Sequence, residues 1–197
     1  MTAVCVVPAT AERWSQLGRV FGPREKNPTS CWCQRFCRHE EPDNRSALRL
    51  EVQEAEVPVG LLAYRDDDAV GWTRVVPRST LPGVTENRAL ARILDDDPDA
   101  WWVSCFVVRR EHRGSGVGAA LLEAAVGWAA QHGASVLDGH PVDAQRLADT
   151  PSPSAVFSGT LAMFQRAGFT EVGRTYRTRP VMRHTLLCTA DRSHNQT

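Results

Sequence analysis

Residues 101–133 read WWVSCFVVRREHRGSGVGAALLEAAVGWAAQHG. The apolar run that ends at Val108 predicts a strand, and the alanine- and leucine-rich run after Gly118 predicts a helix that can pack on a sheet. Between them, glycines alternate with other residues over 113–118. A helix that begins directly after such a turn leaves the backbone N–H groups of its first turn without partners. This stretch therefore predicts an α/β unit with an open, glycine-rich turn.

The chemistry of that turn suits a phosphate ligand. The N-terminus of a helix carries partial positive charge, and Gly114, Gly116 and Gly118 leave the backbone open to close approach. Arg113 can add a charge-assisted contact. The sequence lacks the Gly-Lys-Ser/Thr ending of a Walker loop, and its spacing differs from the dinucleotide fingerprint. A tight turn that merely needs small residues is the alternative, but the flanking strand and helix favour pyrophosphate binding.

Composition narrows the class of protein. The chain has 197 residues, 42% hydrophobic and 23% charged, which is an ordinary globular balance. Its 23 basic and 23 acidic residues cancel, so no net field attracts nucleic acid or an anionic membrane. No apolar run approaches the roughly 18–20 residues of a membrane-spanning helix, and the N-terminus lacks the pattern of a secretion signal. We expect a cytoplasmic protein whose six cysteines are mostly thiols.

The remaining pattern predicts a single domain over 1–188, followed by a polar tail over 189–197. The fold class is α/β (α+β), with a mixed, mostly antiparallel sheet, one central strand–helix–strand crossover and flanking helices. Thr10 is a predicted cap for the first helix, and Asp43 or Asn44 for the second. Strands are expected over 3–7, 58–64, 70–78, 103–108, 134–143 and 169–187 (two strands), and helices over 11–22, 45–55, 86–97, 119–130 and 159–168.

The stretch VVRREHRGSGVGAALLEAA (107–125) resembles the central motif of the GNAT acetyltransferase superfamily. The family pattern, Arg/Gln-x-x-Gly-x-Gly/Ala, is matched by Arg113, Gly116 and Gly118. GLLAYRDDDAVGWTRV and GTLAMFQRAGFTEVGR are similar to the family's second and third strands and to its last helix and following strand. Arg110 stands where many members carry proline. The resemblance covers roughly residues 4–188 and implies a GNAT-type fold with a splayed central strand pair.

The resemblance also implies a co-substrate and a reaction. GNAT proteins bind acetyl-CoA, or sometimes a longer acyl-CoA, and transfer the acyl group directly to an amine, with a backbone N–H of the fourth strand stabilising the oxyanion. The pantetheine arm would lie between the fourth and fifth strands and pair with backbone near Phe106, Val107 and Val108. The pyrophosphate would be held by the amides of Arg113, Gly114, Ser115, Gly116, Val117, Gly118 and Ala119. A homodimer is a family-level expectation.

The acid that protonates the leaving thiolate is not evident. Many family members place a tyrosine five residues before the phenylalanine of the final Gly-Phe pair, and this sequence has Phe164 there. A phenyl ring cannot donate a proton. Ser158 and Thr160 lie just upstream and are candidates to reach the sulfur; helix capping is the alternative role for both.

Asp138 and His140 are the predicted general bases. They are two residues apart on a predicted strand and should share one face, and histidine has a suitable intrinsic pKa. A solvated strand face is the alternative. Asp143 and Glu111 are weaker candidates, and Glu111 is expected to lie in solvent beside the basic turn.

The segment CWCQRFCRHE (31–40) is rich in soft ligands. Its spacing, C-x-C-x3-C-x-H, is not a standard zinc arrangement, so no metal is expected. Small buried thiols around a tryptophan are one reading. The other is a wall of the acceptor site, with Trp32 and Phe36 against substrate. The acidic stretch LDDDPDA (94–100) is expected to be solvated, or else to attract a cationic amine.

These observations predict an acetyl-CoA-dependent N-acetyltransferase that acts on a primary amine of a small molecule, peptide or protein. Phe164 motivates one alternative, a non-catalytic CoA-binding sensor on the same fold. The cysteines motivate another, a small zinc-containing interaction protein.

Overall fold

The computed structural model describes residues 3–22, 27–147 and 156–186. Within them lies one seven-stranded sheet in the order β1-β2-β3-β4-β5-β7-β6. Its strands are β1 (Val4–Pro8), β2 (Gly60–Arg65), β3 (Asp68–Pro77), β4 (Ala100–Val108), β5 (Val136–Gly139), β6 (Thr170–Tyr176) and β7 (Arg179–Thr185). The β4–β5 pair is parallel and the other five pairings are antiparallel. The predicted mixed, mostly antiparallel sheet with one central crossover is confirmed.

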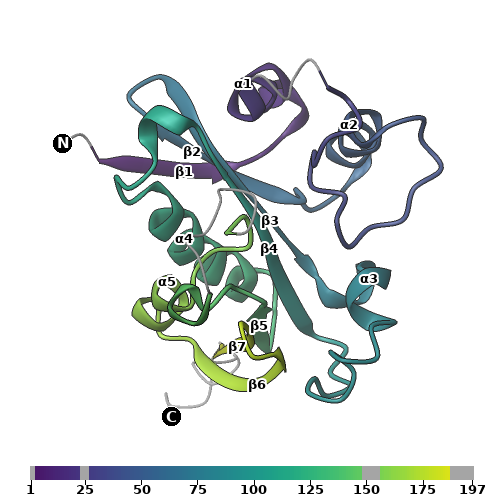
Figure 1. Cartoon of the computed structure of the whole chain (residues 1–197). Helices are drawn as coiled ribbons and strands as arrows, with labels where there is room; N and C mark the ends of the chain where they lie inside the picture. Colours follow the sequence, from purple (N-terminus) through teal and green to yellow (C-terminus); the bar gives the residue numbers. More distant parts are fainter. Residues whose placement is uncertain (1–2, 23–26, 148–155, 187–197) are drawn as a thin grey trace, which may run out of the picture.

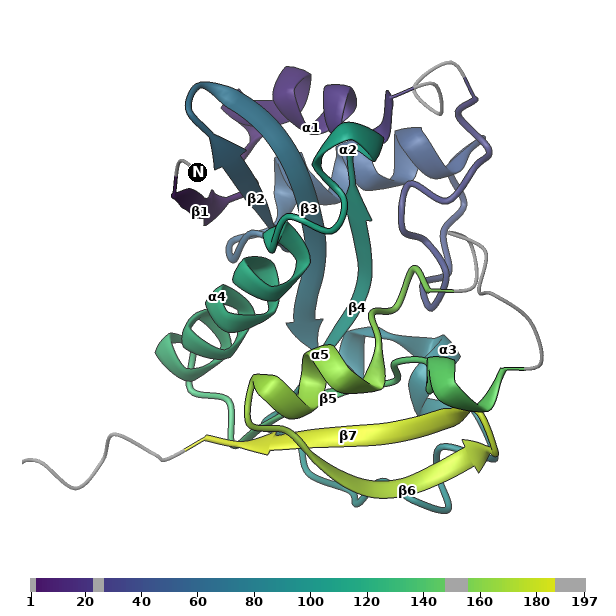
Figure 2. The same cartoon turned by 60° about the vertical axis from the view of Figure 1, so that its left-hand side comes forward.

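Helices cover both faces of this sheet, as Figure 1 and Figure 2 show. They are α1 (Trp14–Phe21), α2 (Asn44–Glu54), α3 (Pro82–Thr85), α4 (Val117–Gln131) and α5 (Leu161–Arg166). One buried cluster joins α1 and α2 to the sheet through Leu17, Leu48 and Trp72. A second joins α4 and α5 to the opposite face through Leu121 and Phe164. The core therefore has two layers of side chains with the sheet between them.

Local chemistry explains where the helices begin and how closely they pack. Asp43 caps α2, because its carboxylate accepts a hydrogen bond from the Ser46 N–H at 2.8 Å. Helix α4 approaches β3 at Gly71, where a Cβ atom would lie 2.7 Å from Val117 Cγ1. Glycine at this position therefore lets the first turn of α4 lie directly on the sheet.

The central strands β4 and β5 separate partway along β4. Their pairing runs from Ala100 opposite Val136 to Val103 opposite Gly139, while β4 continues to Val108. A bulge lies at the same place: on the β3 side, Thr73 pairs with Phe106 but Val75 pairs with Val103, so β4 carries an extra residue between 103 and 106. A bulge bends its strand. Figure 2 shows β4 running upward, away from the β5, β7 and β6 ribbons. The splayed central pair is thereby confirmed.

Two sequence-based expectations are wrong. The helix predicted over 86–97 is a series of turns: the Asn87 side chain accepts from the N–H groups of Ala89 and Leu90 as a helix cap does, but no regular helix follows, and Asp95 is held by Arg183. Thr10 precedes a 3-10 turn but does not cap it; its hydroxyl oxygen accepts from the Arg13 guanidinium at 3.0 Å instead.

The predicted tail over 189–197 and Cys188 lie outside the described residues. Among the helices that the structure describes, none is both long and apolar enough to cross a bilayer.

Candidate functional site

The glycine turn between β4 and α4 has the backbone that the sequence predicts. Gly114 and Gly116 have φ angles of +73° and +88°, in the left-handed region that other residues rarely adopt. Gly116 is the N-cap of α4, and no side chain caps this end of the helix. A Cβ atom built at either glycine meets nothing within 4 Å, so backbone conformation rather than crowding calls for glycine there. The first amides of α4 are left available for a ligand.

Ser115 and Arg65 hold the turn in place. The Ser115 hydroxyl donates to the His112 carbonyl at 2.6 Å, and Arg65 Nη2 donates to the Ser115 carbonyl at 3.0 Å. The groups of Ser115 in these contacts are its hydroxyl and its carbonyl, and neither is a backbone N–H. The contacts order the loop without occupying the donors that a phosphate needs.

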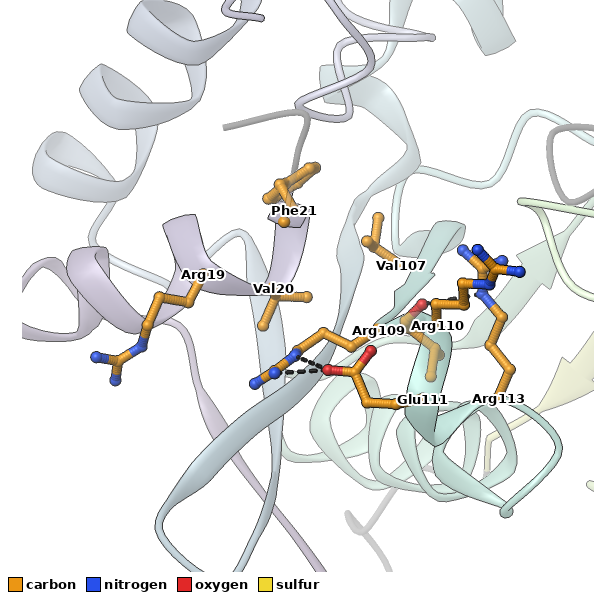
Figure 3. Close-up of a pocket in the computed structure, with 10 residues that line it drawn as sticks. Arg19, Val20, Phe21, Val107, Arg109, Arg110, Glu111 and Arg113 are labelled. Atoms are coloured by element: carbon orange, nitrogen blue, oxygen red, sulfur yellow. Dashed lines mark hydrogen bonds and ion pairs between the residues drawn. The ribbon is translucent and has the colours of Figure 1, made fainter. Parts of the chain in front are cut away.

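A cavity of about 640 Å³ lies beside this turn, between the end of α1 and the end of β4 (Figure 3). We call it the arginine cavity; it is lined by residues 19–22 and 107–111 and by Arg113. Four of these residues are arginines, and the one acid, Glu111, is paired with Arg109 at 2.6 Å. The cavity thus carries excess positive charge, which favours a polyanionic ligand. Glu111 is exposed, as expected.

The edge of β4 that β5 leaves free is partly occupied by the chain itself. The Phe106 N–H donates to the Phe157 carbonyl at 2.6 Å, and the Val108 carbonyl accepts from Arg113 Nε at 3.2 Å. Val107 lies between them, opposite Trp72 of β3. Two of the predicted backbone contacts for pantetheine are therefore engaged inside this chain. A ligand that pairs with β4 must displace the Phe157 carbonyl.

A second cavity, of about 290 Å³, lies where the β6–β7 hairpin meets the segment before α2. We call it the hairpin cavity. Its chemically active lining residues are Arg35, His140, Ser158, Thr175, Tyr176 and Arg179. It brings together two of the three predicted catalytic residues, His140 and Ser158. Phe157, which also lines it, connects it to the free edge of β4.

His140 is held neutral in this cavity. Its Nε2 lies 2.8 Å from Thr175 Oγ1, which fixes the ring. Burial, and then the positive charges of Arg179 and Arg35, lower its pKa from 6.5 to about 4. A neutral imidazole can accept a proton, which suits the predicted role.

This shift predicts a specific dependence of stability on pH. Because the folded chain disfavours protonated His140, the free energy of unfolding is expected to be full above the ordinary pKa of 6.5 and to fall as the pH drops toward about 4. The fall should be roughly 3 kcal/mol, since each pKa unit corresponds to about 1.4 kcal/mol. His140→Gln should abolish it, whereas the same change at exposed His39 should leave it intact. Urea unfolding across this pH range measures the difference; an equal fall in the His140→Gln variant would contradict it.

Ser158 and Thr160 have different roles. Thr160 caps α5, because its hydroxyl accepts from the Met163 N–H at 3.3 Å. Ser158 is no helix cap; its buried hydroxyl oxygen accepts from Arg179 Nη1 at 2.9 Å in the hairpin cavity. The capping alternative is therefore confirmed for Thr160 and wrong for Ser158.

Phe164 is a core residue. Its side chain is fully buried, with edge-to-face ring contacts to Phe106 and Phe169 at centroid distances of 6.2 and 4.8 Å. The ring lies so close to β5 that a Cβ atom at Gly139 would be 2.4 Å from it. The Phe164 side chain fills the core next to Phe106 of β4, and its phenyl ring has no proton to donate.

Asp138 does not share a cavity with His140, and this expectation is wrong. Its fully buried carboxylate accepts from Arg78 Nη1 at 2.8 Å and from Arg183 Nε and Nη2 at 2.7 and 2.9 Å. These contacts occupy both oxygens and tie β5 to β7 and to the end of β3. Such a carboxylate anchors the structure rather than accepting a substrate proton. Asp143 is likewise buried and paired, with Arg174 at 2.8 Å.

The acidic stretch 94–100 does not face either cavity. Asp95 pairs with Arg183 at 2.7 Å, and Asp97 accepts from the Ser135 hydroxyl at 2.5 Å. Its expected attraction for a cationic amine therefore has no structural basis, since neither cavity is lined by these residues.

The cysteines form a cluster that the spacing did not predict. The Sγ atoms of Cys31, Cys33 and Cys105 all lie within 4.8 Å of one another, whereas exposed His39 bonds to Asn44. Burial raises the pKa of Cys33, and hydrogen bonds with Cys31 and Cys33, together with burial, raise that of Cys105. Neutral thiols therefore pack the 31–33 turn against β4.

The tryptophan of this turn belongs to the core. Trp32 is fully buried and stacks on Phe21 at a centroid distance of 4.4 Å, so its expected contact with substrate is wrong. Phe36 does line the hairpin cavity, as expected, together with its neighbour Arg35.

Sequence reasoning missed Arg35, Thr175 and Arg179 as site residues. Arg35 precedes α2, whereas Thr175 and Arg179 lie on β6 and β7, so the three are distant in sequence. Thr175 and Arg179 lie close to the turn of the final hairpin, at the end of β6 and the start of β7. This closeness to one turn is the only signal for them that the sequence offers.

The comparisons with known proteins agree with this geometry. Residues 26–148 match a model described as the acetyltransferase (GNAT) family. No curated protein compared with the chain matches it. Among the solved structures that share its fold is a GCN5-related N-acetyltransferase from Kribbella flavida, with 19% identity, 93% of this chain and 98% of that chain covered, and a TM-score of 0.55. Another is a ribosomal-protein-alanine N-acetyltransferase from Brucella melitensis, with 19% identity, 92% of this chain and 99% of that chain covered, and a TM-score of 0.54. A third is the diaminobutyrate acetyltransferase EctA from Paenibacillus lautus in complex with its substrate and coenzyme A, with 16% identity, 94% of this chain and 96% of that chain covered, and a TM-score of 0.51. With most of its length covered by the family model, this chain belongs to the GNAT acetyltransferase family.

Proposed function

We propose that this protein is an acetyl-CoA-dependent N-acetyltransferase that transfers the acetyl group directly to a primary amine. The observation that carries the proposal is the uncapped, positive-φ glycine turn at the N-terminus of α4, which follows the part of β4 that β5 does not pair. This arrangement places helix amides that suit a phosphate next to a strand edge that β5 does not pair.

The residues present fit the phosphates of CoA. Gly114 and Gly116 have open space where a side chain would lie, and the first amides of α4 have no side-chain cap. Arg113 and Arg110 add positive charge from the arginine cavity. When bound, acetyl-CoA supplies a thioester carbonyl that a neutral amine attacks, with a C–N bond formed as the C–S bond breaks.

The chain's own groups have separable roles in this reaction. The Phe106 N–H, on the edge of β4 that β5 leaves, is a donor available to a developing oxyanion once the Phe157 carbonyl is displaced. His140, neutral and fixed by Thr175, accepts the proton of the attacking amine, directly or through water. Ser158 is the hydroxyl in the hairpin cavity that can donate toward a leaving thiolate, with Arg179 holding its oxygen.

A CoA-binding sensor remains the second candidate. Two observations favour it: the buried phenyl ring of Phe164 in place of a tyrosine, and the Phe106 N–H that the chain itself engages. A sensor would bind acetyl-CoA, but no free CoA would form from it when amines are added.

Two measurements on the purified full chain test the proposal. Calorimetry with acetyl-CoA should give saturable binding, and a thiol-release assay with an amine panel should give acceptor-dependent CoA formation. Binding without release for every amine would favour the sensor. Absence of binding would overturn both functions.

A further inference from the structure

Three cysteine sulfurs meet between the 31–33 turn and β4. The Sγ atoms of Cys31, Cys33 and Cys105 all lie within 4.8 Å of one another, and those of Cys31 and Cys105 are 3.5 Å apart. Cys33 and Cys105 are each 1% exposed, whereas Cys31 is half-buried, so the group is reached from the side of Cys31. The proposed transfer reaction uses none of these thiols.

The turn that carries two of the sulfurs has an unusual backbone conformation. Trp32 and Cys33 have φ angles of +21° and +45°, on the positive side that residues with side chains disfavour. The Gln34 N–H closes the turn by donating to the Cys31 carbonyl at 3.0 Å. The Trp32 indole N–H anchors it by donating to the Asn27 carbonyl at 3.0 Å. Because strained backbone of this kind is concentrated at functional sites and ligand clamps, the turn is expected to do more than pack the core.

The third sulfur comes from the bulge in β4. The extra residue between 103 and 106 brings Cys105 into the cluster under α1 and α2, where Cys33 also packs. A second contact joins the turn to the same bulge, since Cys33 Sγ lies 4.0 Å from Ser104 Oγ. Two local irregularities, a strained turn and a bulge, therefore converge on one group of thiols. The spacing of residues 31–39 cannot reveal this group, because one member comes from a strand.

The arrangement of the sulfurs suits a three-coordinate metal ion. Thiolate–metal bonds of about 2.3 Å, arranged in a plane around one ion, place the sulfurs roughly 4 Å apart. The observed separations are compatible with that spacing. Among the described residues, no fourth His, Cys, Asp or Glu belongs to the group. Structural zinc is almost always four-coordinate and iron–sulfur clusters take four ligands, whereas Cu(I), a soft ion, binds three thiolates without a further ligand.

A buried arginine supplies part of the charge that such a site needs. Arg74 is 3% exposed and pairs with Glu51. Burial raises the pKa of the Cys33 thiol, and the nearby charge of Arg74 acts in the opposite direction. Three thiolates around one monovalent ion keep an excess of negative charge, which a guanidinium group beside them stabilises.

We infer that Cys31, Cys33 and Cys105 form a binding site for a soft monovalent metal ion, Cu(I). Each thiol releases its proton to solvent as its sulfur binds the ion, and no sulfur is oxidised. The inference does not depend on the proposed function. An ion in this position ties the segment before α2, which lines the hairpin cavity through Arg35, to the strand that carries the Phe106 N–H.

The test is a titration of the full-length protein with Cu(I), without oxygen and against a chromophoric Cu(I) chelator. We expect one tightly bound Cu(I) per chain, and X-ray absorption of the complex should show three sulfur neighbours and no nitrogen or oxygen. Cys33→Ala and Cys105→Ala should each weaken binding by more than about a hundredfold, because losing a direct ligand costs more than the roughly 10–100-fold typical of losing an outer partner. Circular dichroism checks that each variant is folded.

Cys37→Ala is the matched control. Cys37 is half-buried in the same segment but lies outside the group of three, so this variant should bind Cu(I) within a few-fold of wild type. Equal loss of affinity in Cys37→Ala would overturn the three-ligand set.

Measurements on the wild-type protein keep the inference falsifiable if a variant does not fold. Wild-type protein that yields its Cu(I) to the chelator, or a complex with fewer than three sulfur neighbours, would overturn the site and leave the thiols as core packing. Zn(II) that binds where Cu(I) does not would overturn the choice of ion. Each of these results leaves the proposed function standing, because acetyl-CoA binding and CoA release are measured separately.

Discussion

Replacing Gly116 with valine is expected to weaken acetyl-CoA binding about a hundredfold, with the fold retained. Gly116 has a φ of +88°, which a β-branched residue strongly disfavours. Because a Cβ atom there would meet nothing within 4 Å, the variant is not blocked by crowding, and the strain is relieved by rotation of the turn. That rotation redirects the first amides of α4, which the proposed function assigns to the pyrophosphate. Calorimetric titration with acetyl-CoA gives the affinity directly.

Gly127→Val is the matched control for this prediction. Gly127 lies in the same helix, with an ordinary φ, and a Cβ atom there also meets nothing within 4 Å. The same chemical change at this position should leave acetyl-CoA affinity within a few-fold of wild type. Circular dichroism of both variants checks that the fold is intact. Unchanged affinity in Gly116→Val would remove the turn from the cofactor site.

Asp138→Asn is expected to lower the free energy of unfolding by about 3 kcal/mol. The substitution leaves Arg78 and Arg183 without the buried carboxylate that both now contact, and Arg78 is itself only 6% exposed. An uncompensated buried charge is among the costliest changes in a protein. For a domain of this size the melting temperature should fall by roughly 6–12 °C.

Glu86→Gln is the control for the effect of losing one ion pair. Its partner is Arg38, and both side chains are largely exposed, so the loss should stay within about 0.5 kcal/mol. Chemical unfolding of the two variants gives the comparison. A further readout separates anchoring from catalysis: folded Asp138→Asn should retain its rate per folded molecule well below its melting temperature. A stable variant with an abolished rate would return Asp138 to the role of base.

The residues of the site differ in how far the sequence could predict them. The turn conformation at Gly114 and Gly116 was predictable, because a strand that leads through alternating glycines into a helix allows few backbone conformations. Ser158 and His140, predicted as catalytic residues, both line the hairpin cavity, although the reason given for His140, a face shared with Asp138, was wrong. Arg35 and Arg179 were missed, because their proximity depends on how the segment before α2 packs against the β6–β7 hairpin. No local pattern encodes that contact.

The bulge in β4 explains why the sequence did not predict the cysteine cluster. Sequence alternation places Val103 and Cys105 on one face of a strand, yet Val103 packs in the cluster under α4 and Cys105 in the cluster under α1 and α2. The extra residue between 103 and 106 reverses the faces and brings Cys105 to Cys31 and Cys33. The zinc spacing considered for residues 31–39 could not include a ligand that comes from β4.

By itself, the sequence determined the order of the strands, the mixed sheet and the glycine turn, because these follow from hydrophobic period and from backbone conformations that only glycine adopts readily. Tertiary structure alone decided which polar groups meet. It buried Asp138 between two arginines, gave Arg35 and Arg179 a shared cavity, and set the Phe157 carbonyl on the edge of β4. Those outcomes depend on contacts between segments far apart in the chain, and the free energy of such contacts is not a property of any one segment.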